Sequence, residues 1–497
     1  MFMEVFNSIS SPINLIMMNI GVAAGIIIGA LPGLSVVVAI TLLLPLTFGM
    51  DSITGMYLLL GAYCGGTYGG SITAILINTP GTPAAGATIF DGYKLAQQGR
   101  AGDALKAALI ASTIGGILSC FSLMFIAPPL AKMALKFGPP EYFALCVFGL
   151  SIVAGISGES VFKGLIMACI GLFISTVGVD ATEGIPRFTF GIIELFGGLS
   201  PAVVMLGMFA LSEMLNKSGR SQRPLENIAK FTKSKLKLKD ILVYWKTLLR
   251  SSAIGIFIGA VPGTGGAIAA FLSYNEARRA SKTPELFGTG ILEGVVAPEA
   301  GNNAVTGATL IPLLTLGIPG DTGVAIMLGA LTMQGIIPGP NLFTAGNFWV
   351  YAIMGGLLVV NIFMLLQGSV FIRAFANVTK VPFSVLVPSV MILCTMGAFA
   401  VSNSVLDIFI MLMFGFMGYI LKKFEFPFPP LTIALVLGSL TENNLRRSLI
   451  MSDGKASIFF TRPIALVFIV ISIISVLFPL LKMALKALKQ QKLTKEG

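Results

Sequence analysis

The chain has 497 residues, of which 55% are hydrophobic and only 11% are charged, and its mean hydropathy is +0.90. A soluble protein could not keep that much apolar surface from water, whereas a lipid bilayer accepts it. The formal charge of +11 comes from basic stretches beside apolar segments, which argues against a nucleic-acid-binding protein.

The residue types also argue against an enzyme. The chain contains no histidine, which excludes histidine-based catalytic triads and the usual zinc-enzyme sites. Its five cysteines are scattered through apolar runs without metal-ligand spacing. No cofactor is therefore expected.

Apolar segments dominate the chain. Windows such as 107–127, 161–177, 351–372, 403–421 and 462–480 are long enough, or nearly so, to cross a hydrocarbon core of about 30 Å. Roughly eleven to fourteen such segments can be counted, depending on where Pro-Gly pairs split them. We expect an all-α polytopic membrane protein.

The first half contains two Pro-Gly breaks. One lies at Pro32-Gly33 in "GIIIGALPGLSVVVA" (25–39), and the other at Pro80-Gly81 in "SITAILINTPGTPAAG" (71–86). Proline removes a backbone donor and clashes with the preceding turn, and glycine adds freedom without packing surface, so a continuous helix is not expected there.

Charge predicts the orientation. Residues 1–93 contain no Lys or Arg, whereas 214–250 contain ten basic residues against two acidic ones, and five lysines follow from Lys482 onward. Basic loops stay in the cytoplasm. The central linker and the C-terminus are expected to be cytoplasmic, and the N-terminus to be outside.

The second half repeats both breaks of the first. Residues 255–269, "GIFIGAVPGTGGAIA", match 25–39 at eight of fifteen positions, and "LIPLLTLGIPGDTGVA" (310–325) parallels 71–86. Two landmarks in the same order indicate an internal duplication. The predicted parts are a first transmembrane repeat (1–213), a basic cytoplasmic linker (214–250), a second transmembrane repeat (251–481) and a basic cytoplasmic tail (482–497).

The two copies are expected to have opposite orientations in the membrane. Counting crossings from the first copy to the linker places its start outside and the start of the second copy inside, as in the inverted-topology repeats of secondary transporters. Arg278, Arg279 and Lys282 fall on the wrong side of this count. A re-entrant hairpin over 252–273 would account for them, and the sequence leaves this open.

The matched breaks predict a polar site inside the membrane. Irregular backbone is tolerated there only where protein or a water-filled cavity covers it. Half-helix N-termini suit a carboxylate, and freed carbonyls suit Na⁺. Proline–glycine kinks and close helix packing are the structural alternative. The expected substrate-binding residues are Ser71, Asn78, Thr79, Pro80, Gly81, Thr82, Gly317, Pro319, Gly320, Asp321 and Thr322. Those expected to hold or support a coupling ion are Pro32, Gly33, Pro262, Gly263, Thr264, Asn302 and Asn303, with Na⁺ considered near Asn302, Asn303 and Asp321.

Several other polar groups fall within or beside apolar runs. Glu293, Glu299 and Asp321 are candidate membrane-embedded acids, with solvated loop carboxylates as the alternative. "GAYCGGTYGG" (61–70) lacks the ending of a phosphate loop, so a packing face or pore lining is expected. "TENNLRRS" (441–448) is expected to be a charged cytoplasmic turn.

At these motifs the chain closely resembles the large membrane subunit of the tripartite tricarboxylate transporters. The matching stretches include "GALPGLS", "YGGSITAILINTPGTPAA", "DGYKLAQQGRAGDAL", "APEAGNNAVTGATLIPLLTLGIPGD" and "LGSLTENNLRRSL". Together with the others they run from about residue 20 to residue 462. One departure is Asp321, where a small or hydroxyl residue is expected in much of the family. A carboxylate at this position would repel an anionic substrate unless a cation or a proton neutralised it.

The resemblance implies a permease of the bacterial inner membrane that works with a small four-helix membrane subunit and a periplasmic solute-binding protein. It implies import of citrate-like carboxylates by symport with Na⁺ or H⁺. The absence of a Walker-type loop agrees with a gradient as the energy source. The alternatives are a stand-alone ion-coupled organic-anion symporter, a channel and a membrane-embedded enzyme. The oligomeric state, including a homodimer, is left open.

Overall fold

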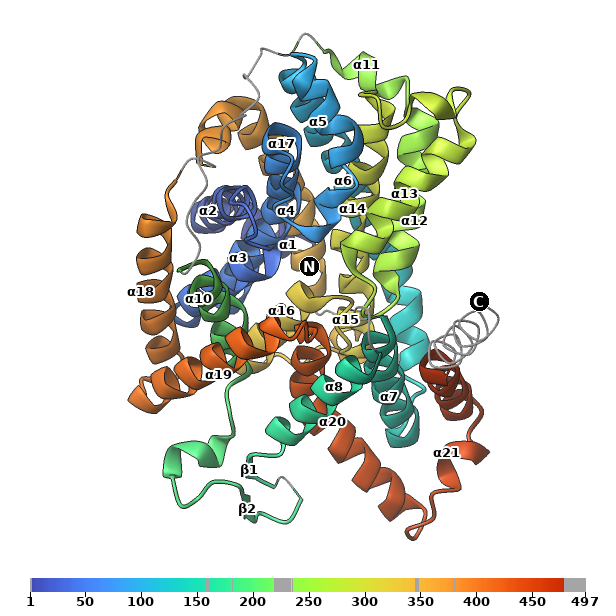
Figure 1. The fold of residues 1–497 in the computed structure, drawn as a ribbon. Coiled ribbons are helices and arrows are strands. Elements are labelled where there is room, and N and C mark those ends of the chain that lie inside the picture. The colour runs from blue at the N-terminus through green and yellow to red at the C-terminus, as the bar shows by residue number, and fades with distance from the viewer. Residues whose placement is uncertain are drawn as a thin grey trace, which may run out of the picture. The chain divides into compact units, whose positions relative to one another are not determined.

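The structure is a computed structural model that describes residues 2–156, 161–180, 182–218, 234, 236–344, 348–378 and 381–477 (Figure 1). The predicted tail at 482–497 and residues 219–233 and 235 of the linker at 214–250 lie outside these residues. The described part is almost entirely helical, with one short antiparallel pair of strands.

Helices of membrane-spanning length confirm the predicted all-α polytopic membrane protein. Those long and apolar enough to cross a bilayer, among the residues that the structure describes, are Pro12–Gly29, Ala101–Ala134, Phe348–Phe375, Ser384–Ser402 and Val405–Lys423. Shorter apolar helices are Val36–Gly49, Pro139–Ile152, Val161–Ser175, Thr322–Met333 and Pro463–Leu477.

The chain forms two compact units, and each unit takes segments from both halves of the sequence. Unit 1 comprises Met1–Ala134 and Ala202–Tyr419, and unit 2 comprises Leu135–Pro201 and Ile420–Gly497. Each unit consists of two segments that are separate in the sequence, whereas each predicted part is one continuous range of residues. The predicted boundaries at 213, 250 and 481 therefore stay a prediction.

Unit 1 holds both pairs of Pro-Gly breaks. Its helices are α1 (Phe2–Ser10), α2 (Pro12–Gly29), α3 (Val36–Leu43), η1 (Leu44–Gly49), α4 (Ser52–Ile77), η2 (Pro83–Gly86), α5 (Ile89–Gln97), α6 (Ala101–Ala134), α9 (Pro201–Met205), η4 (Leu206–Leu211), α10 (Ser212–Ser218), α11 (Leu238–Leu242), α12 (Trp245–Ala260), α13 (Gly265–Ala280), η5 (Pro284–Leu286), α14 (Glu293–Ala308), α15 (Leu310–Leu316), α16 (Thr322–Met333), η6 (Pro340–Phe343), α17 (Phe348–Val378), α18 (Phe383–Ser402) and α19 (Val405–Lys423).

The first break of each half turns the chain back on itself. Helices α12 and α13 pack together about Pro262-Gly263, and an ion pair of 3.9 Å joins Arg250 on α12 to Glu276 on α13. The start of α12 and the end of α13 therefore lie side by side. Residues 252–273 therefore lie in a helical hairpin, and a re-entrant placement in the membrane that would account for Arg278, Arg279 and Lys282 stays a prediction.

Glycines bring equivalent helices of the two halves equally close. A Cβ atom at any of these glycines would collide with the backbone or the side chain of its neighbour, so the helices approach at van der Waals distance. The matching pairs are Gly25 on Ala62 and Gly255 on Gly301, Gly29 on Gly66 and Gly259 on Val305, and Gly81 on Gly70 and Gly320 on Thr309. The alignment made from sequence relates the members of these pairs. The inverted orientation of the two copies stays a prediction.

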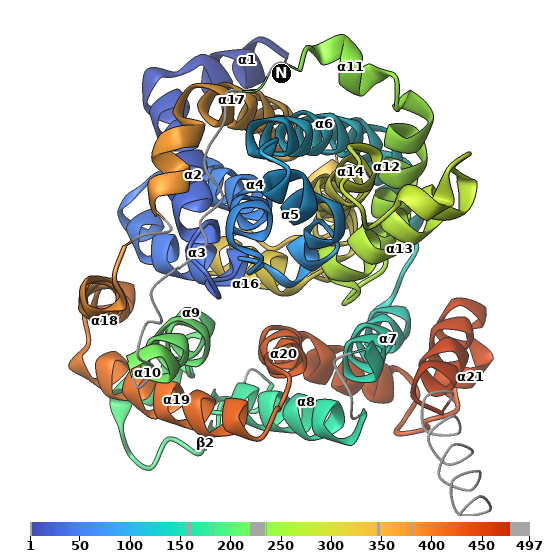
Figure 2. The ribbon, with the colours of Figure 1, turned by 45° about the horizontal axis from the view of Figure 1, so that its top comes forward.

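In each half, the long helix that follows the second break packs against a helix of the other half. Helix α6 packs along α14, with Gly115 against the backbone of Ala300, and α17 packs along α4, with Gly356 against the ring of Tyr57 (Figure 2). The two halves are thus interlocked within unit 1.

The second break of each half follows a helix that ends in the left-handed conformation. Asn78 (φ 56°) caps α4, and its N–H donates to Thr73 O. Gly317 (φ 73°) caps α15, and its N–H donates to Leu313 O. Glycine and asparagine are the residues that adopt this conformation most readily, so they end the two helices at equivalent points.

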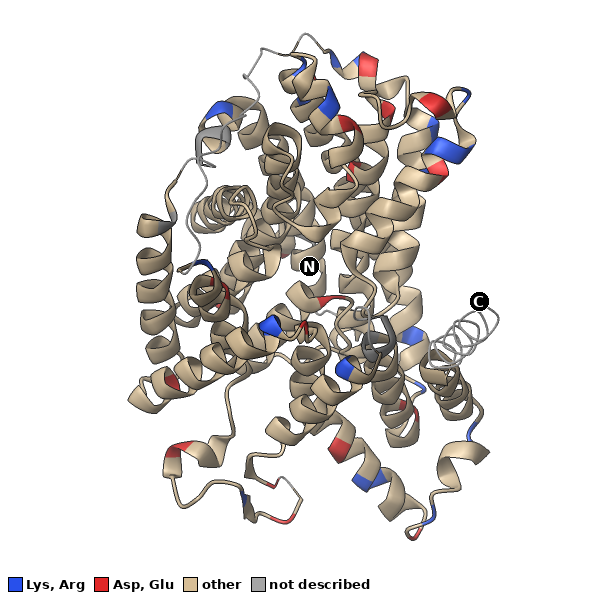
Figure 3. Ribbon diagram, viewed as in Figure 1, with Lys and Arg blue, Asp and Glu red and all other residues tan. Residues whose placement is uncertain are grey.

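Many of the charged residues of unit 1 lie around α5, α11, α12 and α13 (Figure 3). Figure 3 shows Lys, Arg, Asp and Glu around α5, α11, the start of α12 and the end of α13, while the long helices between are nearly free of charge. This separation of charge from apolar length is what a bilayer requires.

Unit 2 contains α7 (Pro139–Ile156), α8 (Val161–Ser175), β1 (Gly178–Val179), β2 (Pro186–Arg187), η3 (Ile193–Gly197), α20 (Phe428–Met451) and α21 (Ile458–Thr461). Helix α20 packs on α7 and α8, and Gly171 of α8 lies against the backbone of Leu431. The β1–β2 hairpin follows α8 directly.

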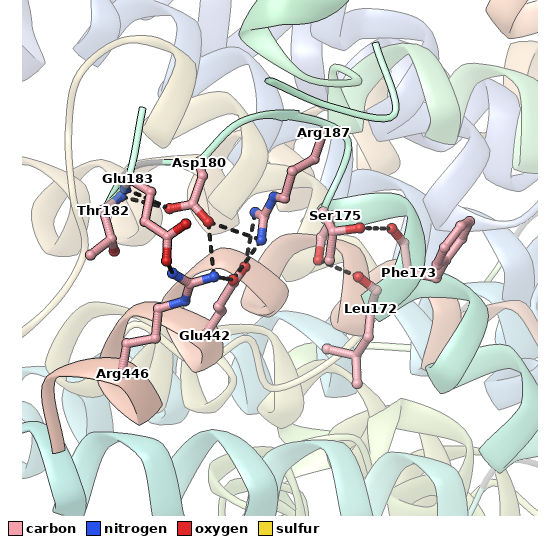
Figure 4. Close-up of polar contacts among 10 residues, drawn as sticks. Leu172, Phe173, Ser175, Asp180, Thr182, Glu183, Arg187, Glu442 and Arg446 are labelled. Atoms are coloured by element: carbon pink, nitrogen blue, oxygen red, sulfur yellow. Dashed lines mark hydrogen bonds and ion pairs between the residues drawn. The ribbon is translucent and has the colours of Figure 1, made fainter. Parts of the chain in front are cut away.

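An ion cluster fastens this hairpin to α20 (Figure 4). Arg187 Nη1 lies 2.7 Å from Glu442 Oε1 and 3.2 Å from Asp180 Oδ2, and Arg446 Nη2 lies 2.8 Å from Asp180 Oδ2 and 2.9 Å from Glu442 Oε1. The expectation of a charged turn at 441–448 was wrong. These residues continue α20, because their charges are paired in this cluster and Asn444 and Ser448 are buried.

Candidate functional site

A cavity of about 210 Å³ in unit 1 brings the breaks of both halves together. Elements α3, α4, α13, α14 and α16 surround it and can be followed in Figure 2. The lining residues are Ser35, Val36, Val37, Tyr63, Thr67, Thr82, Pro83, Ala84, Thr264, Gly265, Gly266, Ala267, Asn302, Val305, Thr306, Asp321, Thr322 and Gly323.

Equivalent positions of the two halves form most of this lining. The alignment that pairs Pro32-Gly33 with Pro262-Gly263 also pairs Ser35–Val37 with residues 265–267. The alignment that pairs Pro80-Gly81 with Pro319-Gly320 relates Tyr63 to Asn302, Thr67 to Thr306, and 82–84 to 321–323, which leaves Thr264 and Val305 without an equivalent in the lining. The cavity therefore lies where equivalent segments face each other.

Three helices begin at residues that line this cavity. Helices α3, α13 and α16 begin just after Ser35, Thr264 and Asp321, and all three of these residues are in the lining. The side chains of Ser35 and Thr264 make no cap hydrogen bond. Each helix N-terminus carries a partial positive charge of about half a unit, which attracts an anion.

The lining holds no lysine or arginine, so helix N-termini and neutral donors are the groups there that could attract an anion. Asn302 is 2% exposed, and its Nδ2 has no hydrogen-bond partner within the described part of the chain. Thr67 and Thr306 donate to carbonyls of their own helices, which leaves their oxygens as acceptors. A buried amide N–H without a partner suits a carboxylate oxygen.

Asp321 is tied to both halves of the sequence. Its Oδ1 accepts the N–H of Val324 at 2.8 Å, which caps α16, and its Oδ2 accepts a hydrogen bond from the Tyr63 hydroxyl. The Tyr63 oxygen also lies 3.1 Å from Thr309 Oγ1. Both carboxylate oxygens of Asp321 therefore accept hydrogen bonds, one from the backbone of α16 and one from the Tyr63 phenol.

The structure brings together five of the residues predicted from sequence. Thr82, Thr264, Asn302, Asp321 and Thr322 line the cavity.

The other predicted residues lie around the cavity rather than in its lining. Pro80, Gly81, Gly317, Pro319, Gly320, Pro262 and Gly263 form the corners, and the N–H of Gly263 donates to Gly320 O at 2.7 Å. Pro32 and Gly33 form the turn after α2, where Lys217 donates to Pro32 O at 2.6 Å. Asn78 and Thr79 are exposed at the end of α4, while Ser71 and Asn303 are buried within α4 and α14. The binding roles given to these residues stay predictions.

The sequence did not single out Ser35, Tyr63, Thr67 or Thr306. Tyr63 and Thr67 are four residues apart on α4, and Asn302 and Thr306 are four apart on α14. That spacing puts each pair on one helix face. Polar residues at such spacing inside the glycine-rich run 61–70 were the available signal.

The three candidate embedded acids lie in different surroundings. Glu299 is completely buried, whereas Asp321 and Glu293 are half-buried. Glu293 begins α14 and accepts from the hydroxyls of Thr247 at 2.5 Å and Ser281 at 3.4 Å.

Comparison with known proteins decides the family. The tripartite tricarboxylate transporter TctA family matches residues 15–433, which is most of the chain and includes every residue of the cavity lining. The chain belongs to the TctA family. This is a family of transporters rather than of enzymes, and its members form the large subunit of a tripartite system, so partner subunits belong with it.

Two relatives of this TctA-family chain come from Agrobacterium vitis. An uncharacterized 52.8 kDa protein in the TAR-I ttuC' 3' region is 36% identical over 477 residues, which cover 96% of this chain and 95% of the relative. An uncharacterized protein in the TAR-II ttuC' 3' region is 34% identical over 227 residues, 46% of this chain and 94% of that protein. No solved structure matches the chain.

Proposed function

We propose that this chain is the permease subunit of a binding-protein-dependent secondary transporter that imports a small carboxylate, citrate-like or related, using a Na⁺ or H⁺ gradient. Its partners would be a small four-helix membrane subunit and a periplasmic solute-binding protein in a bacterial inner membrane. The central linker and the C-terminus would face the cytoplasm, and the N-terminus the outside.

One observation carries this proposal: the N-termini of three helices from both halves meet at one cavity whose lining has no cationic side chain. Such a cavity binds an anion through backbone N–H groups and dipoles. Its lining by equivalent positions suits a site that opens to either side of the membrane in turn, as in transporters built from inverted repeats.

In the proposed cycle, the binding protein delivers substrate from outside. The carboxylate groups accept hydrogen bonds from Asn302 and from the first N–H groups of α3 and α13. One part of the repeat structure then moves against the rest, in an elevator-like motion, and exposes the site inward. The hydrogen bonds of Asp321 disperse its charge, and a proton or a coupling cation neutralises it, because an ionised carboxylate would repel the substrate.

Uptake by vesicles that carry the reconstituted complex tests this function. Labelled citrate, tartrate and succinate would be offered with Na⁺ and pH gradients imposed separately. We expect gradient-driven accumulation of at least one of them that requires both partners. Equal uptake without the partners would favour a stand-alone symporter, and uptake that ignores every gradient would favour a channel. No uptake of any carboxylate by an intact complex would refute the proposal.

A matched pair of variants then tests the cavity. Asn302→Ala removes the unpartnered amide from the lining and is expected to raise the KM of uptake about tenfold or more, the effect of losing a hydrogen bond to a charged group. Asn444→Ala is the control, because it removes another buried amide, from α20 in unit 2, and should leave KM unchanged.

A further inference from the structure

A completely buried carboxylate in unit 1 is surrounded by hydroxyl groups. Glu299 on α14 is 0% exposed. Ser71 Oγ on α4 and Thr88 Oγ1, just before α5, each lie 2.5 Å from Glu299 Oε1, and Ser112 Oγ on α6 lies 2.9 Å from Oε2. We call Glu299 and these three residues the Glu299 cage.

The cage contains a buried carboxyl group without a positively charged partner among the described residues. No Lys or Arg within the described ranges forms an ion pair with Glu299, whereas Glu141 pairs with Arg462, and Asp91, also completely buried, accepts three backbone N–H groups at 2.8 to 3.0 Å. An ionised carboxylate inside a membrane protein is expensive unless a charge or a proton compensates it. Hydroxyl donors alone reduce that cost without removing the charge.

Two more polar oxygens near the cage have no partner. Asn303 donates through Nδ2 to the backbone oxygen of Glu299 at 3.2 Å, and its Oδ1 is buried and unpaired within the described residues. The Tyr68 hydroxyl is also buried and unpaired there, one turn before Ser71 on α4. The described structure thus gathers oxygen atoms beyond those that the carboxylate uses.

We propose that the Glu299 cage binds a monovalent metal cation, with Na⁺ as its ion. Hard cations prefer carboxylate, carbonyl and hydroxyl oxygens, which are the atoms present here. A single carboxylate balances one positive charge, so a divalent ion would leave a net charge buried. The serine and threonine hydroxyls now donate to the carboxylate, and the same oxygens can turn their lone pairs to an ion.

The cage and the cavity share their elements. Ser71 lies one turn after Thr67 on α4, Glu299 lies one turn before Asn302 on α14, and Thr88 follows the lining segment 82–84. A bound cation would therefore fix the segments that line the cavity. Its role in driving import rests on the proposed function, whereas the cation site itself does not.

Cation binding is tested on the purified full-length chain by its unfolding temperature. NaCl is compared with choline chloride at equal ionic strength, because a ligand that binds only the folded state raises its stability. We expect stabilisation by Na⁺ that exceeds that by choline. Glu299→Gln, which keeps the size and most of the hydrogen bonds, should abolish the difference.

Glu293→Gln is the matched control, because Glu293 is a second hydroxyl-bound carboxylate on α14. It should keep the full response to Na⁺. Ser112→Ala removes one ligand and is expected to raise the half-saturating Na⁺ concentration about tenfold, the size of one lost contact to a charge.

The same Na⁺ response in Glu299→Gln as in the wild type would overturn the proposal. So would a wild-type protein that NaCl stabilises no more than choline chloride, which is also the result expected if Glu299 carries a proton instead. The unfolding measurement needs no substrate. A chain that binds Na⁺ through Glu299 and yet moves no carboxylate would therefore refute the proposed function and leave the cation site standing.

Discussion

Tyr63 on α4 donates a hydrogen bond to the carboxylate of Asp321 at the start of α16, and this bond joins the two halves of the sequence at the wall of the cavity. Tyr63 and Asn302 are equivalent positions, as are Thr82 and Asp321. The bond therefore breaks the equivalence of a largely matched lining. It keeps the carboxylate of Asp321, the departure from the expected family pattern, hydrogen-bonded to the phenol.

Tyr63→Phe is expected to weaken substrate binding while leaving the fold intact. Loss of a hydrogen bond to a charged group costs about 1.5–3 kcal/mol, so the KM of uptake should rise roughly tenfold or more because Asp321 is freed toward the anion. Initial uptake rates over a range of substrate concentrations measure this. Tyr57→Phe is the control: the Tyr57 hydroxyl donates instead to Ala352 O at 3.0 Å, outside the cavity. Equal KM values for the two variants would show that the Tyr63 hydroxyl does not contribute to substrate binding.

Asn78→Gly is expected to keep wild-type uptake, whereas Asn78→Ala should lower the stability of the protein by roughly 1 kcal/mol. The reason is the left-handed conformation at Asn78, which glycine adopts freely and alanine does not. Thermal unfolding and uptake would be measured for both variants. Slower uptake by a stably folded Asn78→Gly protein would instead support the carboxylate-binding role predicted from sequence.

Gly320→Ala should damage the second-half corner. A Cβ atom there would lie 2.7 Å from Thr309 Cα, and overpacking of this kind typically costs about 1–3 kcal/mol. A lower unfolding temperature and reduced uptake are expected. Gly49→Ala serves as the control, because a Cβ atom at Gly49 would meet nothing within 4 Å. If both alanine variants unfolded at the wild-type temperature, the close corner packing described above would be incorrect.

The ion cluster of Asp180, Arg187, Glu442 and Arg446 should make unit 2 sensitive to acid. The backbone N–H groups of Thr182 and Glu183, followed by Arg446 and Arg187, hold the pKa of Asp180 below its usual value of 3.8. A carboxyl group with a lowered pKa stabilises the folded state above its usual pKa, and this contribution is lost as the pH falls through the lowered pKa.

Proteolysis of the segment after β2 as a function of pH measures this effect. Cleavage should increase below about pH 4 in the wild type. In Asp180→Asn, cleavage should already be faster at neutral pH and should change less on acidification. A wild-type acid response that Asp180→Asn reproduces in full would assign the sensitivity to other carboxyl groups.

The sequence predicted the corners well because proline and glycine act locally. Pro80-Gly81 and Pro319-Gly320 break helices in the structure as expected, and polar residues next to them, Thr82 and Asp321, reach the cavity. What the sequence could not show is which neighbouring polar residue faces inward. Asn78 ends α4 in the left-handed conformation and is exposed outside the cavity lining, and its predicted role as a ligand stays a prediction.

Long-range packing accounts for what the sequence reasoning missed. For 61–70 the sequence left a packing face and a pore lining open, and the packing of α3 and of second-half helices near Tyr63 and Thr67 puts these two residues in a cavity lining. Residues 441–448 looked like a turn because of their charges, but Asp180 and Arg187, far away in the chain, pair those charges along a continuous helix. Neither relationship is visible in local composition.

Substrate protection of a cysteine in the cavity tests the central claim most directly. In a Cys169→Ser background the native cysteines left are buried, so Thr322→Cys, half-buried in the lining, and Thr283→Cys, exposed on a loop, can be labelled separately in the assembled complex. The account predicts that a saturating concentration of the transported carboxylate slows labelling at position 322 severalfold and leaves position 283 unchanged. If the complex transports the carboxylate but the carboxylate does not change the rate of labelling at position 322, the account is contradicted.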